Sequence, residues 1–175
     1  MTEGLPLSHS YNLARLGNSG DTVSFAADEA QRAAIAKWSG ALSLEKLDVT
    51  VTIAKLGATR FGLDFTLTAE VTQACIVSLE PVPAQIAHHF RRELLFTGPL
   101  RHKPGEDDSE VVLDLANEEG PEEIQSLHYD LAVPALEEYV LSLEPYPRRP
   151  GVAFTPQSQP SEPPENPFAV LKGLK

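Results

Sequence analysis

Two neighbouring stretches in the first half of the chain alternate between apolar and polar residues. In residues 47–56 and 61–70, nearly every second position is apolar and the positions between them are mostly polar. A period of two places alternate side chains on opposite faces of a β-strand. Because Gly57 and Ala58 separate the two stretches, the pattern predicts a hairpin with one buried face and one solvated face.

Further strands are predicted on both sides of this hairpin. Residues 10–16 are typical of a first strand, which ends at the turn-forming residues 17–21. Strand character continues from 71 to 79, and the prolines at 81 and 83 are expected to interrupt it. Residues 86–96 fit both the period of a strand and the four-residue spacing of a helix, and we favour the strand.

Two helices are predicted from apolar spacing and capping residues. The first covers residues 28–39, with Asp28 as its N-terminal cap. The second covers residues 130–143, with Asp130 as its cap and a proline in the first turn, where the missing N–H does no harm. An apolar stripe at helical spacing predicts core packing of this second helix through Leu136, Val140 and Leu143.

The order of these segments predicts an α+β fold, because strands and helices do not alternate as they do in a parallel α/β sheet. We expect a single domain over residues 1–150, with a mainly antiparallel sheet that is either open or barrel-like. From residue 145 to the end, eight of 31 residues are proline, which predicts a disordered linker over 151–165. Residues 166–175 follow as a short amphipathic motif.

The stretch after residue 97 is polar and then strongly acidic. We predict a loop over 98–109, a short strand over 111–115, and an irregular or briefly helical segment over 117–125. The net charge of the chain is -11, and residues 106–147 contain 13 carboxylates but no Lys or Arg. This charge excludes the commonest mode of nucleic-acid binding, in which an overall basic protein releases counterions from phosphate.

The acidic block has two interpretations. It is either a solvated region that keeps the protein soluble or a docking surface for a basic protein, since a field of one sign speeds encounter with an oppositely charged partner. Ten of its carboxylates are the candidate partner-binding residues of this surface: Glu106, Asp107, Asp108, Glu110, Glu118, Glu119, Glu122, Glu123, Glu137 and Glu138.

A small basic cluster is the alternative contact site, here for RNA phosphate. It consists of Arg91, Arg92, Arg101 and Lys103, with three histidines beside it in the sequence. The same cluster is equally typical of a solvated strand edge and loop. On a strand, the neighbouring phenylalanines share a face with Arg92, so we expect them to pack inward and not to stack on bases.

Catalytic and metal-dependent chemistry has little support in the sequence. Cys75 is the only cysteine, which excludes an intrachain disulfide and a cysteine-rich zinc site. His88 or His89 could act as a base for Cys75 in a small hydrolase, yet no hydrolase signature surrounds it, and a lone cysteine in an apolar strand is usually buried core. We therefore expect no catalytic residue, metal, cofactor or small-molecule substrate. With neither an apolar run long enough to span a membrane nor a signal peptide at the first residues, we expect a cytoplasmic protein that binds no membrane.

The C-terminal motif has a cap-like start at Asn166-Pro167. Its apolar residues recur at helical spacing, and they are Phe168, Val170, Leu171 and Leu174. An isolated helix of this length is marginal in water, so the motif is expected to bury this face either on its own domain or on a partner.

Several motifs, taken in order, resemble the YceD family, known as large ribosomal RNA subunit accumulation protein. The first is Gln73-Ala74-Cys75-Ile76-Val77-Ser78-Leu79-Glu80-Pro81-Val82, where Ser78 stands in place of a second cysteine. The second is Tyr129-Asp130-Leu131 with the acidic-aliphatic stretch that ends at Pro147-Arg148, and the third is Asn166-Pro167-Phe168-Ala169-Val170-Leu171. The resemblance implies a role in accumulation of large-subunit (23S) ribosomal RNA, hence in ribosome assembly, with no assigned catalytic activity.

Together, the residues and the resemblance predict a non-enzymatic ribosome-assembly factor. Its acidic surface is expected to engage a basic ribosomal protein or a particle on the way to the large subunit. Direct binding of ribosomal RNA through the basic cluster is the alternative, and a cysteine-dependent hydrolase is a third possibility.

Overall fold

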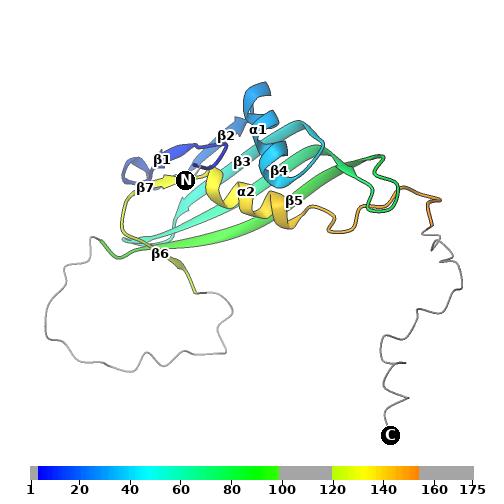
Figure 1. The fold of residues 1–175 in the computed structure, drawn as a ribbon. Helices are drawn as coiled ribbons and strands as arrows, with labels where there is room; N and C mark the ends of the chain where they lie inside the picture. Colours follow the sequence, from blue (N-terminus) through cyan, green and yellow to red (C-terminus); the bar gives the residue numbers. More distant parts are fainter. Residues whose placement is uncertain (1–3, 99–119, 154–175) are drawn as a thin grey trace, which may run out of the picture.

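The computed structural model describes residues 4–98 and 120–153, and it confirms an α+β fold (Figure 1). The main sheet has the order β2-β3-β4-β5-β6, and the bounds of its strands are Asp21–Ala26, Ser43–Lys55, Arg60–Ala74, Pro81–Phe96 and Glu122–Ile124. All its neighbouring strands are antiparallel except β5 and β6, which are parallel. A second, two-stranded sheet pairs β1 (Ser10–Asn12) with β7 (His128–Asp130), and the helices are α1 (Glu29–Ser39) and α2 (Ala132–Leu141).

The barrel-like alternative is wrong, because the five-stranded sheet is open. Within the described residues, β2 and β6 are its two edges and do not pair with each other. Both helices contribute to the same buried cluster as β3 and β4, so they cover one face of the sheet (Figure 1). The other face carries mostly Thr, Ser and charged side chains and is solvated.

The predicted hairpin is confirmed and forms the centre of the sheet. β3 and β4 pair antiparallel with Val49 opposite Leu67 and Val51 opposite Phe65. These apolar residues are 0–1% exposed, whereas Thr66, on the opposite face, is exposed. The two-residue period therefore placed every side chain on the correct face, since the face alternates strictly along a strand.

The strand over residues 86–96 is also confirmed, but it begins earlier, at Pro81. The amide of Phe96 donates to the carbonyl of Thr59, so even-numbered residues of β5 bond toward β4. The backbone hydrogen-bonding positions of residues 81 and 83 therefore face away from β4, toward the edge of the sheet. Because β6 pairs only with residues 94–96, no N–H is needed there within the described residues, and the prolines do not interrupt the strand.

The expected strand over residues 71–79 is wrong in its second half. β4 ends at Ala74, and residues 75–79 form a turn that returns the chain into β5. In this turn the amide of Leu79 donates to the carbonyl of Cys75, and Leu79 adopts the left-handed backbone region with a φ of 61°. Apolar residues fill this turn, so its composition resembles that of a strand and the local pattern does not distinguish the two.

Three shorter segments also differ from expectation. The first strand covers only Ser10–Asn12, and residues 13–15 form a 3-10 helix in which the Asn12 side chain accepts a hydrogen bond from the amide of Ala14. Strand β2 was not predicted, although residues 22–25 alternate in polarity. Residues 122–124, expected to be irregular or helical, form strand β6, which depends on pairing with β5.

The helix predictions are confirmed in kind and differ at the ends. Asp28 caps α1 through a reciprocal pair of hydrogen bonds with Gln31, as expected from the sequence. α2 begins at Ala132 and not at Asp130, which ends β7. Asp130 still serves the helix start, because its Oδ1 accepts from the amide of Ala132 at 3.0 Å.

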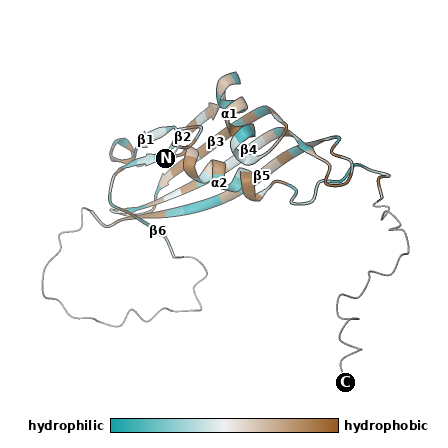
Figure 2. Ribbon diagram, viewed as in Figure 1, coloured by the Kyte–Doolittle hydropathy of each residue, from teal (hydrophilic) through white to brown (hydrophobic). Residues whose placement is uncertain are grey.

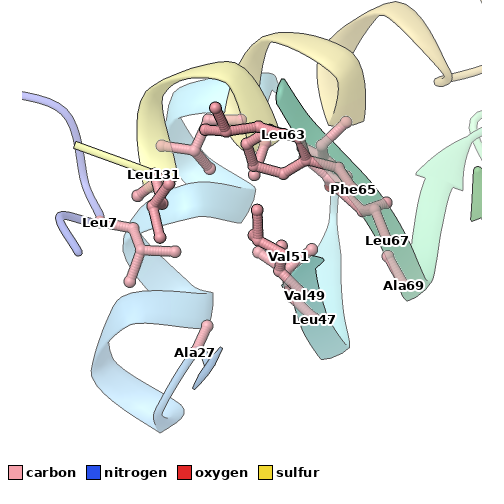
Figure 3. Packing of buried hydrophobic residues seen from close by; sticks show 14 of the residues in the cluster. Leu7, Ala27, Leu47, Val49, Val51, Leu63, Phe65, Leu67, Ala69 and Leu131 are labelled. Carbon is pink, nitrogen blue, oxygen red and sulfur yellow. The ribbon is translucent and has the colours of Figure 1, made fainter. Parts of the chain in front are cut away.

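The buried core lies between the helices and the inner face of the sheet (Figure 3). α2 is largely hydrophobic (Figure 2), and its Leu136 and Tyr139 are fully buried. The expected stripe is only partly buried, because Val140 is 37% exposed and Leu143 is half-buried. Phe90 packs inward as expected and stacks on Phe65 with ring centroids 4.6 Å apart.

Tyr139 offers a test of this core. Its ring is fully buried, burial raises the pKa of its hydroxyl, and that hydroxyl makes no hydrogen bond, while the nearby Ser39 hydroxyl donates to Ala36 O. A buried polar group without a partner costs free energy. We expect Tyr139→Phe to raise the free energy of unfolding by up to about 1 kcal/mol in urea titration. A lower free energy of unfolding for Tyr139→Phe would contradict the conclusion that the Tyr139 hydroxyl has no hydrogen-bond partner.

Several predictions fall outside the described residues. These include the loop beyond residue 98, the strand over 111–115, most of the proline-rich linker, and the C-terminal motif. Among the residues that the structure covers, neither helix is long and apolar enough to cross a membrane.

Candidate interaction surface

Charged side chains from β5 and α2 meet on the inner side of the sheet. The Arg92 guanidinium lies 3.1 Å from Glu138 and 3.5 Å from Glu137, measured from Nη2 to the carboxylate oxygens. His88 Nε2 lies 3.3 Å from the other Glu138 oxygen. Only 18% of the Glu138 side chain is exposed. Its carboxylate lies between His88 and Arg92, which are on the same face of β5.

Glu122 joins this group from the neighbouring strand. The Tyr129 hydroxyl donates to Glu122 at 3.0 Å, and burial, together with the charge and hydrogen bond of Glu122, raises the pKa of Tyr129. Glu122 pairs with Leu94, two residues along β5 from Arg92, so it lies on the same face of the sheet as Arg92. We call Glu122, Glu137 and Glu138 the carboxylate group.

The carboxylate group is more negative than its own cations can balance. Two of the three carboxylates contact the one guanidinium, and the histidine is a cation only when protonated. Glu123, the next residue on β6, is exposed but pairs with Leu95 and therefore lies on the other face of the sheet. The other six acidic candidates lie in residues 106–119, which come shortly before β6 in the sequence and are outside the described residues.

The basic cluster is divided between the two faces of the sheet. Arg91 lies on the outer face, where it contacts Glu93 at 3.3 Å and Asp64 at 3.9 Å, while Arg92 faces the carboxylate group. Exposed ion pairs contribute about 0–1 kcal/mol, so these contacts balance charge and do little to hold the fold. The two described arginines of the cluster therefore do not form one basic patch, and Arg101 and Lys103 lie outside the described residues.

Cys75 lies in the turn after β4, where it is fully buried. A hydrogen bond from the Ser78 hydroxyl, and then amide hydrogen bonds from Arg149, Ser78 and Val77, lower the pKa of the Cys75 thiol to about 6. The Arg149 amide lies 3.4 Å from the sulfur and brings the segment after α2 against this turn. The thiol thus holds two distant parts of the chain together.

The structure does not bring Cys75 together with His88 or His89. His88 pairs across the sheet with Leu67, which lies eight residues before Cys75 on β4 and its following turn. At about 3.3 Å per residue, the two side chains are roughly 25 Å apart, and His89 is farther still. Neither histidine can act as the base for this cysteine, since proton transfer requires hydrogen-bond contact.

The other residues of the family-like motifs have structural roles. Pro81 begins β5, Leu131 is fully buried, and Glu80 forms an ion pair with Arg149. Leu79, by contrast, is 76% exposed. The first motif therefore builds a turn that presents apolar side chains to solvent.

Asp130, at the end of β7, connects the N-terminal segment with the start of α2. Its carboxylate accepts from the Ser8 hydroxyl at 2.6 Å and from the amides of His9 and Ala132 at 2.7 and 3.0 Å. Partial burial acts to raise the pKa of Asp130, but these hydrogen bonds and the nearby His9 outweigh it and hold the pKa below its usual value. Asp130 thereby ties the N-terminal segment to the start of α2.

We expect Asp130→Ala to lower the free energy of unfolding by about 1–3 kcal/mol at pH 7, because three donors lose their acceptor. A lowered folded-state pKa stabilises the fold above the unfolded value near 4 and ceases to do so as the pH falls through the folded value. The difference between the wild type and Asp130→Ala should therefore shrink between pH 5 and about pH 2 in urea titrations. An unchanged difference would contradict the charged role of Asp130.

Comparisons with known proteins give no relative: no family model, no curated protein and no solved structure matches the chain. Within residues 4–98 and 120–153, no group of three or more His, Cys, Asp or Glu side chains is arranged to hold a metal ion.

Sequence reasoning considered His88 as a base for Cys75 and a neighbour of the basic cluster but missed its contact with Glu138, and it missed the contacts of Tyr129 and Arg149. His88 shared a face with Arg92 in the predicted strand, so its place in this cluster could have been found from the period. The contacts of Tyr129 and Arg149 depend on pairings across the fold that leave no local pattern.

Proposed function

We propose that the protein is a non-enzymatic ribosome-assembly factor that binds a basic ribosomal protein through its acidic surface and so supports accumulation of large-subunit ribosomal RNA. The ribosomal context rests on the resemblance of its motifs to the YceD family. The acidic contact rests on the charge of the chain and on the carboxylate group beside β6.

The observation that carries the proposal is the excess of negative charge in the carboxylate group, which has three carboxylates and one permanent cation, Arg92. Glu137 and Glu138 share Arg92, Glu122 lies on the same face of the sheet, and the acidic residues 106–119 precede β6 in the sequence. A basic partner can replace the contact of Arg92 with the exposed Glu137 at little cost, because exposed pairs contribute about 0–1 kcal/mol. Carboxylates that screen Lys and Arg would keep such a partner soluble until phosphate competes for it.

Direct RNA binding is the weaker candidate. Binding to phosphate requires cations that face one way, and Arg91 and Arg92 lie on opposite faces, each beside carboxylates of its own chain. A net charge of -11 also repels the RNA backbone.

Gradient sedimentation of cell extracts tests the assembly role. Affinity-tagged protein should co-sediment with precursors of the large subunit and, after mild salt elution, release one or more basic proteins of that subunit. Its deletion should lower the amount of 23S RNA relative to 16S RNA. Sedimentation only at the top of the gradient, together with an unchanged RNA ratio, would contradict the proposal.

A further inference from the structure

One end of the sheet exposes apolar side chains from two separate segments. Ile76 is 45% exposed, Leu79 and Leu141 are each 76% exposed, and Tyr146 is 68% exposed. We call these four residues the apolar end patch. Such clustering is unusual for a solvated surface, because large apolar patches on soluble proteins are generally interaction sites.

Direct contacts bring the two segments together. The amide of Ile76 donates to the carbonyl of Pro147 at 2.9 Å, next to Tyr146. Glu80, which follows Leu79, pairs with Arg149, and the Gln73 side chain donates to the carbonyl of Glu144, three residues after Leu141. Figure 1 shows the segment after α2 running beside the turn between β4 and β5, and Figure 2 shows the hydrophobic colour of that turn.

We propose that the apolar end patch is the docking site for residues 166–175 of the same chain. The described chain ends at Ala153, where the amide of Val152 donates to the carbonyl of Arg149, so the tail departs from the patch itself. The 12 residues between 154 and 165 reach about 20 Å on average if flexible, and up to about 40 Å if extended. A tether of this length gives an effective concentration in the millimolar range.

The chemistry of the tail matches that of the patch. Phe168, Leu171 and Leu174 recur at a spacing that gives a helix one apolar face, and a helix this short needs a surface to be stable. The rim of the patch carries both signs of charge, because Glu144, Arg148 and Arg149 are all exposed there, so the match rests on the apolar residues. The proposal concerns the resting protein and does not depend on the ribosomal role.

The test compares NMR spectra of the ¹⁵N-labelled full chain with those of a chain that ends at residue 165. We expect the amide shifts that differ to be those of residues 75–79 and 140–149, and to be independent of protein concentration. Phe168→Ser/Leu171→Ser in the full chain should reproduce the spectrum of the shortened chain at these positions.

The patch is tested by Leu79→Ser/Leu141→Ser, which changes two exposed leucines and should leave the fold intact. This variant should lose the shift differences between the full and shortened chains. Leu56→Ser is the matched control, because Leu56 is 46% exposed in the turn between β3 and β4, at the opposite end of those strands, and should retain the differences. Identical spectra of the two wild-type lengths would overturn the proposal, as would differences that grow with protein concentration, which would indicate docking onto a second copy.

Discussion

Replacing Phe65 by alanine is expected to lower the free energy of unfolding by about 3–5 kcal/mol. Phe65 is fully buried on the central strand β4, pairs with Val51 on one side and stacks on Phe90 on the other. Its removal loses both the transfer energy of the ring and the contacts around the cavity that remains, because the packed sheet can close only in part. A loss of this size is a large fraction of the 5–15 kcal/mol that stabilises a typical domain.

Urea titration followed by circular dichroism measures this effect. Leu42→Ala is the control for an exposed leucine, since Leu42 is 55% exposed and lies outside the apolar end patch, and we expect its change to stay within about 0.5 kcal/mol. Equal changes for the two variants would show that Phe65 is not at the centre of the core.

Neutralising the exposed carboxylates near β6 is expected to weaken binding of the basic partner by about tenfold or more, which corresponds to about 1.4 kcal/mol. The variant is Glu122→Gln/Glu137→Gln, which leaves the half-buried Glu138 in place. Loss of two charges on the same face of the sheet removes attraction at short range and should also reduce the salt dependence of binding.

The control for this variant changes the same number of charges elsewhere. Glu29 and Glu70 are exposed and lie outside the acidic block, so their replacement by Gln gives the same net charge. Screening limits the reach of a surface charge to about 8 Å at physiological salt, so we expect less than a threefold change. If both variants weaken binding equally, net charge and not the carboxylate group accounts for the interaction.

Local patterns predicted the parts of the fold that depend on local rules. The alternation around Val51 and Phe65 gave the hairpin and its faces, and Asp28 gave the start of α1. The strand containing Arg91 and Arg92 was also predicted, and its period implies that these two residues lie on opposite faces.

The remaining features depend on pairings between distant residues. β6 and β7 are three-residue strands that exist only because β5 and β1 lie beside them. The turn at Cys75 has the apolar composition of a strand, yet the amide of Ile76 donates to the carbonyl of Pro147 and the Cys75 sulfur accepts from the amide of Arg149. The contact between Arg92 and Glu138 joins residues 46 positions apart, which a single sequence does not reveal.

The most direct test of the acidic-surface proposal is a binding comparison with purified components. The immobilised full chain is offered either RNA-free proteins extracted from large ribosomal subunits or bare 23S RNA, each at 50 and 300 mM salt. The account predicts that basic proteins bind at the lower salt and are released at the higher salt, while the RNA does not bind at either. Retention of the RNA, or failure to retain any basic protein, would contradict it.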